Sequence, residues 1–97
     1  MWHDIVLAPE AAHEPRRLTA NIRSDVRDAI EKHLRHQPGK TSKGRIKRLR
    51  GVSRPQFRLR VGDARIFYDV SGRTVEVLAI VLKSGAEVWL KEAGEKT

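Results

Sequence analysis

Residues 56–82 read QFRLRVGDARIFYDVSGRTVEVLAIVL, and this stretch decides the fold. Apolar and polar side chains alternate over 56–61, as on a strand with one buried face. Short turn sequences containing glycine follow at 62–63 and 71–73. The pattern therefore predicts three consecutive antiparallel strands, with the last and most apolar one at the centre of the sheet: residues 56–61, 64–70 and 74–82.

The first part of the chain predicts a short strand and two helices. Residues 4–7 read as a strand, Pro9 suits the first turn of a short helix, and Pro15 ends or kinks that helix. Thr19 is a suitable N-cap for a longer helix that stops before Pro38. The apolar side chains of this helix recur at every fourth position, which predicts one buried stripe: Ile22, Val26, Ile30 and Leu34.

The remaining segments complete a single domain. Residues 40–45 predict a basic loop, and residues 46–49 predict a short turn held to the core. Residues 85–92 predict a closing helix whose apolar side chains, Trp89 among them, fold back on the sheet. Residues 1–97 therefore predict one α+β domain, with an N-terminal strand and a helical hairpin packed on one face of a mostly antiparallel four-stranded sheet, and a short C-terminal helix.

Positive charge is concentrated in the middle of the chain. Between Glu31 and Asp63 there is no acidic residue, and eleven of the 31 residues are Lys or Arg. The whole chain has 20 basic and 12 acidic side chains, so the rest of it is slightly negative. Such a cationic surface attracts polyphosphate by Coulomb forces and counterion release. The charge continues into the alternating strand at Arg58 and Arg60, which predicts an anionic partner on one sheet face.

Several kinds of site are not expected. The chain has no cysteine, so disulfides and thiolate metal sites are excluded. His33 and His36 have a spacing that could hold a metal, but the sequence offers no evident third ligand. The longest apolar run, residues 75–82, is too short to span a bilayer, and the N-terminus lacks the regions of a signal peptide. We expect a cytoplasmic protein that needs no cofactor, no metal and no membrane partner.

Several motifs in this order resemble the core of the RelE/ParE superfamily, the toxins of bacterial type II toxin–antitoxin systems. They are IKRLRG at 46–51, FRLRV at 57–61 and RIFYDV at 65–70, and VEVLAI at 75–80 continues the match as the last long strand. The short helical hairpin, residues 8–35, is more similar to the RelE-like branch than to the ParE-like branch.

The resemblance implies a toxin that a cognate antitoxin protein neutralises. RelE-like members cut mRNA on the ribosome and so inhibit translation. They use the 2′-hydroxyl of the substrate as the nucleophile and need no metal. By this resemblance we expect a ribosome-dependent mRNA endoribonuclease whose partners are the antitoxin, the mRNA and the ribosomal RNA around it.

The resemblance also implies the site residues. Arg58, Arg60 and Arg65 align with basic positions that bind the phosphate and stabilise its developing charge. RelE-like nucleases usually carry a basic pair after the last strand and a tyrosine further on, and here Lys83 and Trp89 take those places. Lys83 is thus the fourth expected catalytic residue, whereas tryptophan can stack on a base but cannot transfer a proton. We expect further RNA contacts from the basic segment and from this tryptophan: Lys40, Lys43, Arg45, Lys47, Arg48, Arg50, Arg54 and Trp89.

Two other functions remain open from the sequence. ParE-like members of the superfamily bind and poison DNA gyrase, and the missing basic pair and tyrosine favour this alternative. A nucleic-acid-binding module of the same fold with weak or no catalysis is the other. Three outcomes of induction distinguish the functions. Growth arrest with new RNA 5′ ends indicates the endoribonuclease, growth arrest without them indicates the gyrase inhibitor, and no growth arrest indicates the binding module.

Overall fold

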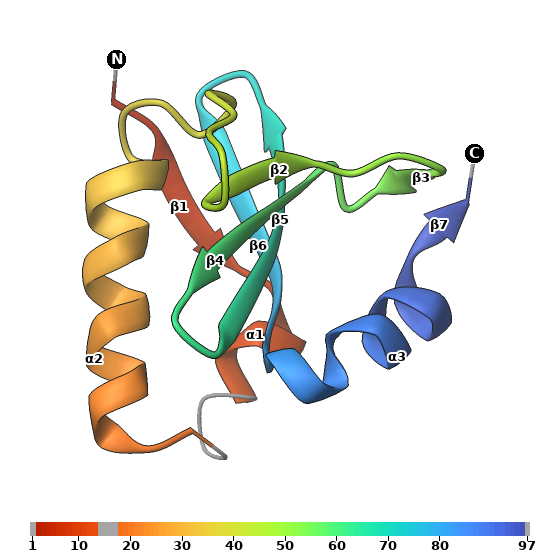
Figure 1. Ribbon diagram of the computed structural model, residues 1–97. Coiled ribbons are helices and arrows are strands. Elements are labelled where there is room, and N and C mark those ends of the chain that lie inside the picture. The colour runs from red at the N-terminus through yellow and green to blue at the C-terminus, as the bar shows by residue number, and fades with distance from the viewer. Residues whose placement is uncertain (1, 14–17, 97) are drawn as a thin grey trace.

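The computed structural model describes residues 2–13 and 18–96, and within them a five-stranded sheet lies at the centre (Figure 1). Its strand order is β1-β6-β5-β4-β2. The pairing is antiparallel except between β1 and β6, which run parallel. The strands are β1 (Asp4–Leu7), β2 (Ile46–Arg48), β4 (Phe57–Val61), β5 (Ala64–Ser71) and β6 (Thr74–Leu82).

Two parts of the predicted sheet need correction. Residues 46–48 form the edge strand β2, not a turn, because Lys47 pairs with Arg58 and its neighbours continue the ladder on β4. The sheet therefore has five strands where four were predicted. The apolar strand β6 is an interior strand, but the middle of the sheet is β5, since β1 adds on the outer side of β6.

The helices lie on both sides of this sheet. They are α1 (Pro9–His13), α2 (Ala20–Ala29), which continues as a wider π-helical turn η2 (Ile30–Leu34), and α3 (Lys83–Ala93). Figure 1 shows α2 along one side of the sheet and α3 on the other, with α1 between their lower ends. The Thr19 hydroxyl accepts a hydrogen bond from the backbone N–H of Ile22 at 3.2 Å, which confirms the predicted N-cap. The predicted break at Pro15 lies outside the described residues.

The core fills the space between the helical hairpin and one sheet face. Val26, Ile30 and Leu34 are buried and Ile22 packs partly buried beside them, so the predicted stripe is confirmed. They meet the inward side chains of the three predicted strands, which include Leu59, Ile66, Tyr68, Val75 and Val77, all 0% exposed. Ala11 of α1 joins the same core. The cationic side chains of β4 project to the opposite face.

A small two-stranded ribbon was not predicted. It pairs β3 (Val52–Arg54) with β7 (Glu95–Lys96), antiparallel and with an irregular register. The ribbon brings the end of the chain back to the segment between β2 and β4, beyond α3 (Figure 1). Strands of two and three residues carry too short an alternation to be recognised in a sequence.

Replacing Tyr68 with phenylalanine is expected to destabilise the fold. The hydroxyl of this fully buried side chain donates a hydrogen bond of 2.6 Å to the backbone carbonyl of Pro38, where the loop leaves η2. Without it the Pro38 carbonyl loses its buried partner, so we expect the free energy of unfolding to fall by about 1–3 kcal/mol. Urea unfolding of the variant and the unaltered protein measures this. An unchanged unfolding midpoint would show that the bond contributes nothing.

Candidate functional site: a cationic groove

Cross-strand register places the predicted site residues together on the face away from α2. Lys47 of β2, Arg58 of β4 and Phe67 of β5 stand opposite one another in one row. Arg60 and Arg65 stand opposite each other in the next row. Since directly paired residues project to the same side of a sheet, these two rows form one continuous surface.

The part of this surface that carries Lys47, Arg58, Phe67 and Arg65 is the floor of a groove with a volume of about 560 Å³. Side chains of α3 form its other wall, so α3 partly covers the sheet face on which the anionic partner was expected. Four cations line it, Lys47, Arg58, Arg65 and Lys83, together with apolar atoms and one carboxylate. We call this site the cationic groove and define it by Lys47, Arg58, Arg65, Phe67, Lys83 and Glu87.

Arg58 has the least satisfied side chain of the groove. Its Nε is buried and has no hydrogen-bond partner, and no ion pair to Arg58 occurs within residues 2–13 and 18–96. Burial first, and then the nearby charge of Arg60, lowers the pKa of its guanidinium from the ordinary value. Both causes act against a charge that forms no ion pair among the described residues, so an anion bound in the groove would stabilise it.

Arg65 has a second, structural task. It is 7% exposed, and its Nη1 donates hydrogen bonds to the carbonyls of Gly62 at 2.8 Å and Ala64 at 2.9 Å. These bonds hold the turn between β4 and β5. Burial lowers its pKa, and the charges of Arg58 and Arg60 add to that effect while Asp63 opposes it. Removing Arg65 would therefore disturb the turn as well as the charge of the groove.

Lys83 reaches the groove because α3 begins at the turn between β4 and β5. Its backbone N–H donates a hydrogen bond of 2.6 Å to the carbonyl of Asp63. Four residues later, Glu87 lies on the same helix and also lines the groove. Glu87 was not predicted as a site residue, since nothing in the sequence alone shows which side of this short helix faces the sheet.

The exposed Arg60 lies at the rim. It is not among the residues that line the groove, but its register partner Arg65 is. Its backbone N–H donates to the carbonyl of Arg45 at 2.8 Å, which ties the start of β2 to the end of β4.

The predicted RNA-binding residues separate into several places. Lys47 lies in the cationic groove, whereas Lys40 and Arg45 line a different pocket, between η2 and β2. Lys43 and Arg50 are exposed, and Arg48 is exposed with its guanidinium 5.2 Å from the centre of the Phe57 ring.

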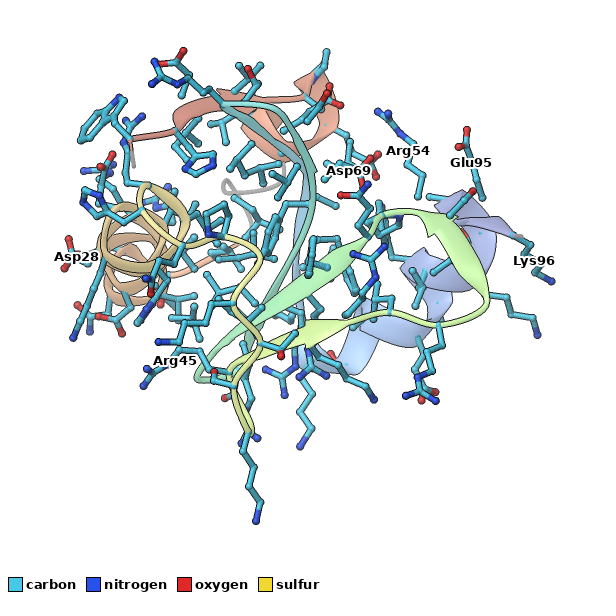
Figure 2. All side chains as sticks on the ribbon, turned by 90° about the horizontal axis from the view of Figure 1, so that it is seen from above. Asp28, Arg45, Arg54, Asp69, Glu95 and Lys96 are labelled. Carbon is cyan, nitrogen blue, oxygen red and sulfur yellow. The ribbon has the colours of Figure 1, made fainter. Side chains whose placement is uncertain are left out.

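Arg54 is occupied by acidic partners. Its guanidinium pairs with the Glu76 carboxylate at 2.9 Å and with that of Asp69 at 3.5 Å. Figure 2 shows Arg54 beside Asp69 and Glu95, and Arg45 on the other side of the molecule, toward α2. A contact of Arg54 with RNA stays a prediction, and it would have to compete with these two carboxylates.

Trp89 packs on the sheet. Its ring stacks on Phe67, with the centroids 4.7 Å apart, and its Nε1 donates a hydrogen bond of 2.7 Å to the Glu10 carboxylate of α1. The indole thereby fixes α3 against the groove face and links it to the helical hairpin. Stacking of Trp89 on a base stays a prediction, but one of its ring faces already has an aromatic partner.

No tyrosine or histidine lines the cationic groove among the described residues. Tyr68, the chain's single tyrosine, lies on the core face, and burial raises the pKa of its phenol far above the ordinary value. No cluster of three potential metal ligands occurs in residues 2–13 and 18–96, and no helix there is long and apolar enough to cross a membrane.

The fold and its basic face correspond to a known toxin family. The sequence profile of the ParE toxin of the type II toxin–antitoxin system parDE matches residues 5–86. The chain belongs to this toxin family. The resemblance to the RelE/ParE superfamily is thereby confirmed, and the protein is a toxin of a type II toxin–antitoxin system.

Two solved structures share the fold. The RelB–RelE antitoxin–toxin complex from Methanococcus jannaschii aligns with a TM-score of 0.69 at 20% identity, covering 87% of this chain and 96% of that one. The RelBE2 toxin–antitoxin complex from Mycobacterium tuberculosis aligns with a TM-score of 0.70 at 20% identity, covering 84% of this chain and 99% of that one. No curated protein matches the sequence. The predicted α+β fold is confirmed. The family match does not distinguish an RNase from a gyrase inhibitor.

Proposed function

We propose that this toxin is a ribosome-dependent mRNA endoribonuclease that binds the backbone of mRNA in the cationic groove. One observation carries the proposal. Among the described residues, the groove brings four cations together with a single carboxylate, and the buried Nε of Arg58 has no hydrogen-bond acceptor there. A phosphodiester supplies the missing negative charge and two hydrogen-bond acceptors.

The chemistry needs no nucleophile from the protein. The 2′-oxygen of the substrate forms a bond to the adjacent phosphorus as the bond from phosphorus to the 5′-oxygen breaks, which leaves a 2′,3′-cyclic phosphate and a 5′-hydroxyl. Arg58 and Arg65 would hold the phosphate in line and stabilise the extra negative charge of the transition state. Lys83 would give a proton to the leaving 5′-oxygen, as its ammonium is a donor.

The proton of the 2′-hydroxyl needs an acceptor, and we assign Glu87 to this role. Guanidinium groups are poor bases, because their pKa lies far above neutrality. Glu87 is the one carboxylate among the described lining residues, and it sits on the α3 wall, across from the floor that carries Arg58. Carboxylates act as general bases in many hydrolytic sites.

Replacing Glu87 with glutamine is expected to lower the cleavage rate about 100-fold, since general-base catalysis contributes about 10²–10⁴-fold. RNA affinity should stay equal or increase, because a negative charge leaves the groove. Single-turnover cleavage on programmed ribosomes and binding of a non-cleavable RNA measure the two effects. The matched control is Glu92→Gln, an exposed position on the same helix that does not line the groove. A variant at position 87 with the unaltered cleavage rate would remove Glu87 from the mechanism.

Gyrase inhibition is the second candidate. It is favoured by the match to the ParE family and by the absence of an imidazole or phenol from the described groove lining. Mapping new RNA 5′ ends and the DNA-damage response after brief induction in a bacterial host separates the two functions. The proposal expects new ends inside coding regions, in phase with codons, with no early damage response. Growth arrest with a damage response and unchanged transcripts would overturn it in favour of gyrase.

We also propose that a cognate antitoxin binds this chain and blocks the groove. The two solved structures described above are toxin–antitoxin complexes, which supports such a partner. An apolar groove of about 300 Å³ between β1 and α2, lined by Ile5, Leu7, Val26 and Ile30 among others, offers a place for one of its segments. Acidic groups of the antitoxin would pair with Arg58 and Arg60. Co-expression with the small open reading frame next to the toxin gene should yield a stable complex without cleavage activity, and the failure to form any complex would contradict this partner.

A further inference from the structure

A second pocket lies on the other side of β2 from the cationic groove. It has a volume of about 280 Å³ and is formed by the end of η2, the loop after it and the first residue of β2. Its charged and titratable lining residues are Lys32, His33, His36, Lys40 and Arg45, and no carboxylate is among its described lining residues. We call it the histidine pocket.

The loop that forms this pocket is ordered by its own hydrogen bonds. The backbone N–H of Ser42 donates to the carbonyl of Ile46 at 3.0 Å, and its hydroxyl accepts from the backbone N–H of Ile46 at 3.3 Å. The backbone N–H of Arg45 donates to the carbonyl of Ser42 at 3.3 Å, and the backbone N–H of Lys40 donates to the carbonyl of Gln37 at 3.2 Å. These hydrogen bonds give the loop a defined conformation. They hold the backbone of Lys40 and Arg45 on either side of Ser42.

The positive charge of the pocket is larger than the negative charge that the described residues place beside it. Lys32, Lys40 and Arg45 carry three full charges and form no ion pair within the described part of the chain. The C-terminal end of the α2–η2 helix contributes only about half a negative charge. A bound phosphate would supply a full negative charge with several hydrogen-bond acceptors.

β2 connects this pocket to the cationic groove. Lys47 of β2 lies in the groove, the adjacent Ile46 lines the histidine pocket, and the carbonyl of Arg45 is bonded to Arg60 at the rim. Only a short edge strand separates the two sites, so one polyanionic strand that crosses it can fill both. A free anion could fill only one of them.

We propose that the histidine pocket binds a second phosphate of the same RNA strand, and that protonation of His33 strengthens this binding at mildly acidic pH. The proposal rests on the RNA target proposed above. It extends the binding surface across β2, toward α2, and gives the toxin a pH-dependent affinity for its substrate.

The direction of the pH effect follows from the surroundings of His33. Burial lowers its pKa below the ordinary value of 6.5, and the charges of Arg45 and Lys32 lower it further. His36 and Lys40, the other titratable groups of the pocket, add no negative charge near it. This lowered pKa favours the neutral imidazole in the free protein. A bound phosphate would offset these charges and raise the pKa, so binding takes up a proton and becomes tighter as the pH falls.

The test uses a 2′-O-methyl oligouridylate of about twelve nucleotides, which cannot be cleaved and whose bases do not titrate in this range. For the unaltered toxin we expect affinity to rise about tenfold as the pH falls from 7.5 to 5.5, since a shift of one pKa unit corresponds to a factor of ten. His33→Gln should keep the affinity at the higher pH and lose most of the rise. His3→Gln, outside both sites, should retain the rise.

Two further measurements separate this proposal from a merely structural role of His33 and from the cleavage proposal. NMR titration of the His33 imidazole should show a higher pKa with the oligonucleotide than without it. Arg45→Ala should lower the salt dependence of binding by about one phosphate contact. A His33→Gln variant with the full pH response, or a His33 pKa that only inorganic phosphate raises, would overturn the proposal. Because the probe is not cleaved, a toxin that fails to cut mRNA refutes the cleavage proposal and leaves this measurement valid.

Discussion

Replacing Arg58 with alanine is expected to lower mRNA cleavage by about 10²–10³-fold, which is the loss typical of removing one preorganised donor to a developing charge. The stability of the fold should be unchanged or should increase. The buried Nε of Arg58 has no acceptor, and its charge stands near Arg60 and Arg65, so the free protein loses an unfavourable group. A catalytic defect without destabilisation is the combination that a binding residue produces. Single-turnover cleavage rates and urea unfolding of the same preparation measure it.

The control for this prediction is Arg73→Ala. Arg73 is exposed in the turn between β5 and β6, whereas the groove lies toward the opposite end of these strands, at the turn between β4 and β5. The Arg73→Ala substitution removes the same charge as Arg58→Ala and should change the cleavage rate by less than about threefold. Arg65→Ala is a less informative variant, because Arg65 also holds the carbonyls of Gly62 and Ala64. Equal cleavage by the Arg58 and Arg73 variants would exclude Arg58 from the site.

Raising the salt concentration from 50 to 200 mM is expected to weaken RNA binding about 1000-fold. A strand that engages about seven phosphates across the cationic groove and the histidine pocket gives a slope of about −5 in a plot of log affinity against log salt. The expectation follows from the net charge of +8 and from its concentration between Glu31 and Asp63. Fluorescence anisotropy with the non-cleavable oligonucleotide at several salt concentrations measures the slope.

Two variants locate the charges that cause the salt effect. Lys47→Ala, in the groove, should reduce the slope by about 0.7, the contribution of one single-strand phosphate. Arg54→Ala should reduce the slope by less than Lys47→Ala does, because RNA would have to compete with Glu76 and Asp69 for Arg54. A slope near zero for the unaltered protein would mean that binding does not depend on phosphates.

The sequence was sufficient for the parts of the fold that rest on local periodicity. The alternation at 56–61 and the turns at 62–63 and 71–73 correctly predicted the three-strand meander, and Thr19 with the every-fourth-residue stripe correctly predicted α2. The same alternation placed Arg58 and Arg60 on the face away from α2. These features are set by neighbours in the chain, which is why they can be read from it.

The features that were missed depend on partners far along the chain. Residues 46–48 become a strand only because Lys47 meets Arg58, and a three-residue basic segment does not show this by itself. Glu87 enters the groove because the N–H of Lys83 is bonded to Asp63, which sets where α3 starts. The pairing of Arg54 with acids on β5 and β6, and the meeting of His33 with Arg45, likewise depend on the assembled sheet. Charge composition predicted an anionic partner, but tertiary contacts decide which cations are available to bind it.

The most direct test of the proposed function is cleavage of a ribosome-bound mRNA by the purified toxin, with one nucleotide of the A-site codon made 2′-deoxy. If the groove positions a phosphate for attack by the 2′-oxygen of the substrate, the unmodified mRNA is cut, and the bond after the deoxy nucleotide stays intact. The Arg58→Ala toxin should cut the unmodified mRNA about 10²–10³ times more slowly. Intact mRNA in every reaction, or cleavage after the deoxy nucleotide at the same rate, would contradict the proposed mechanism.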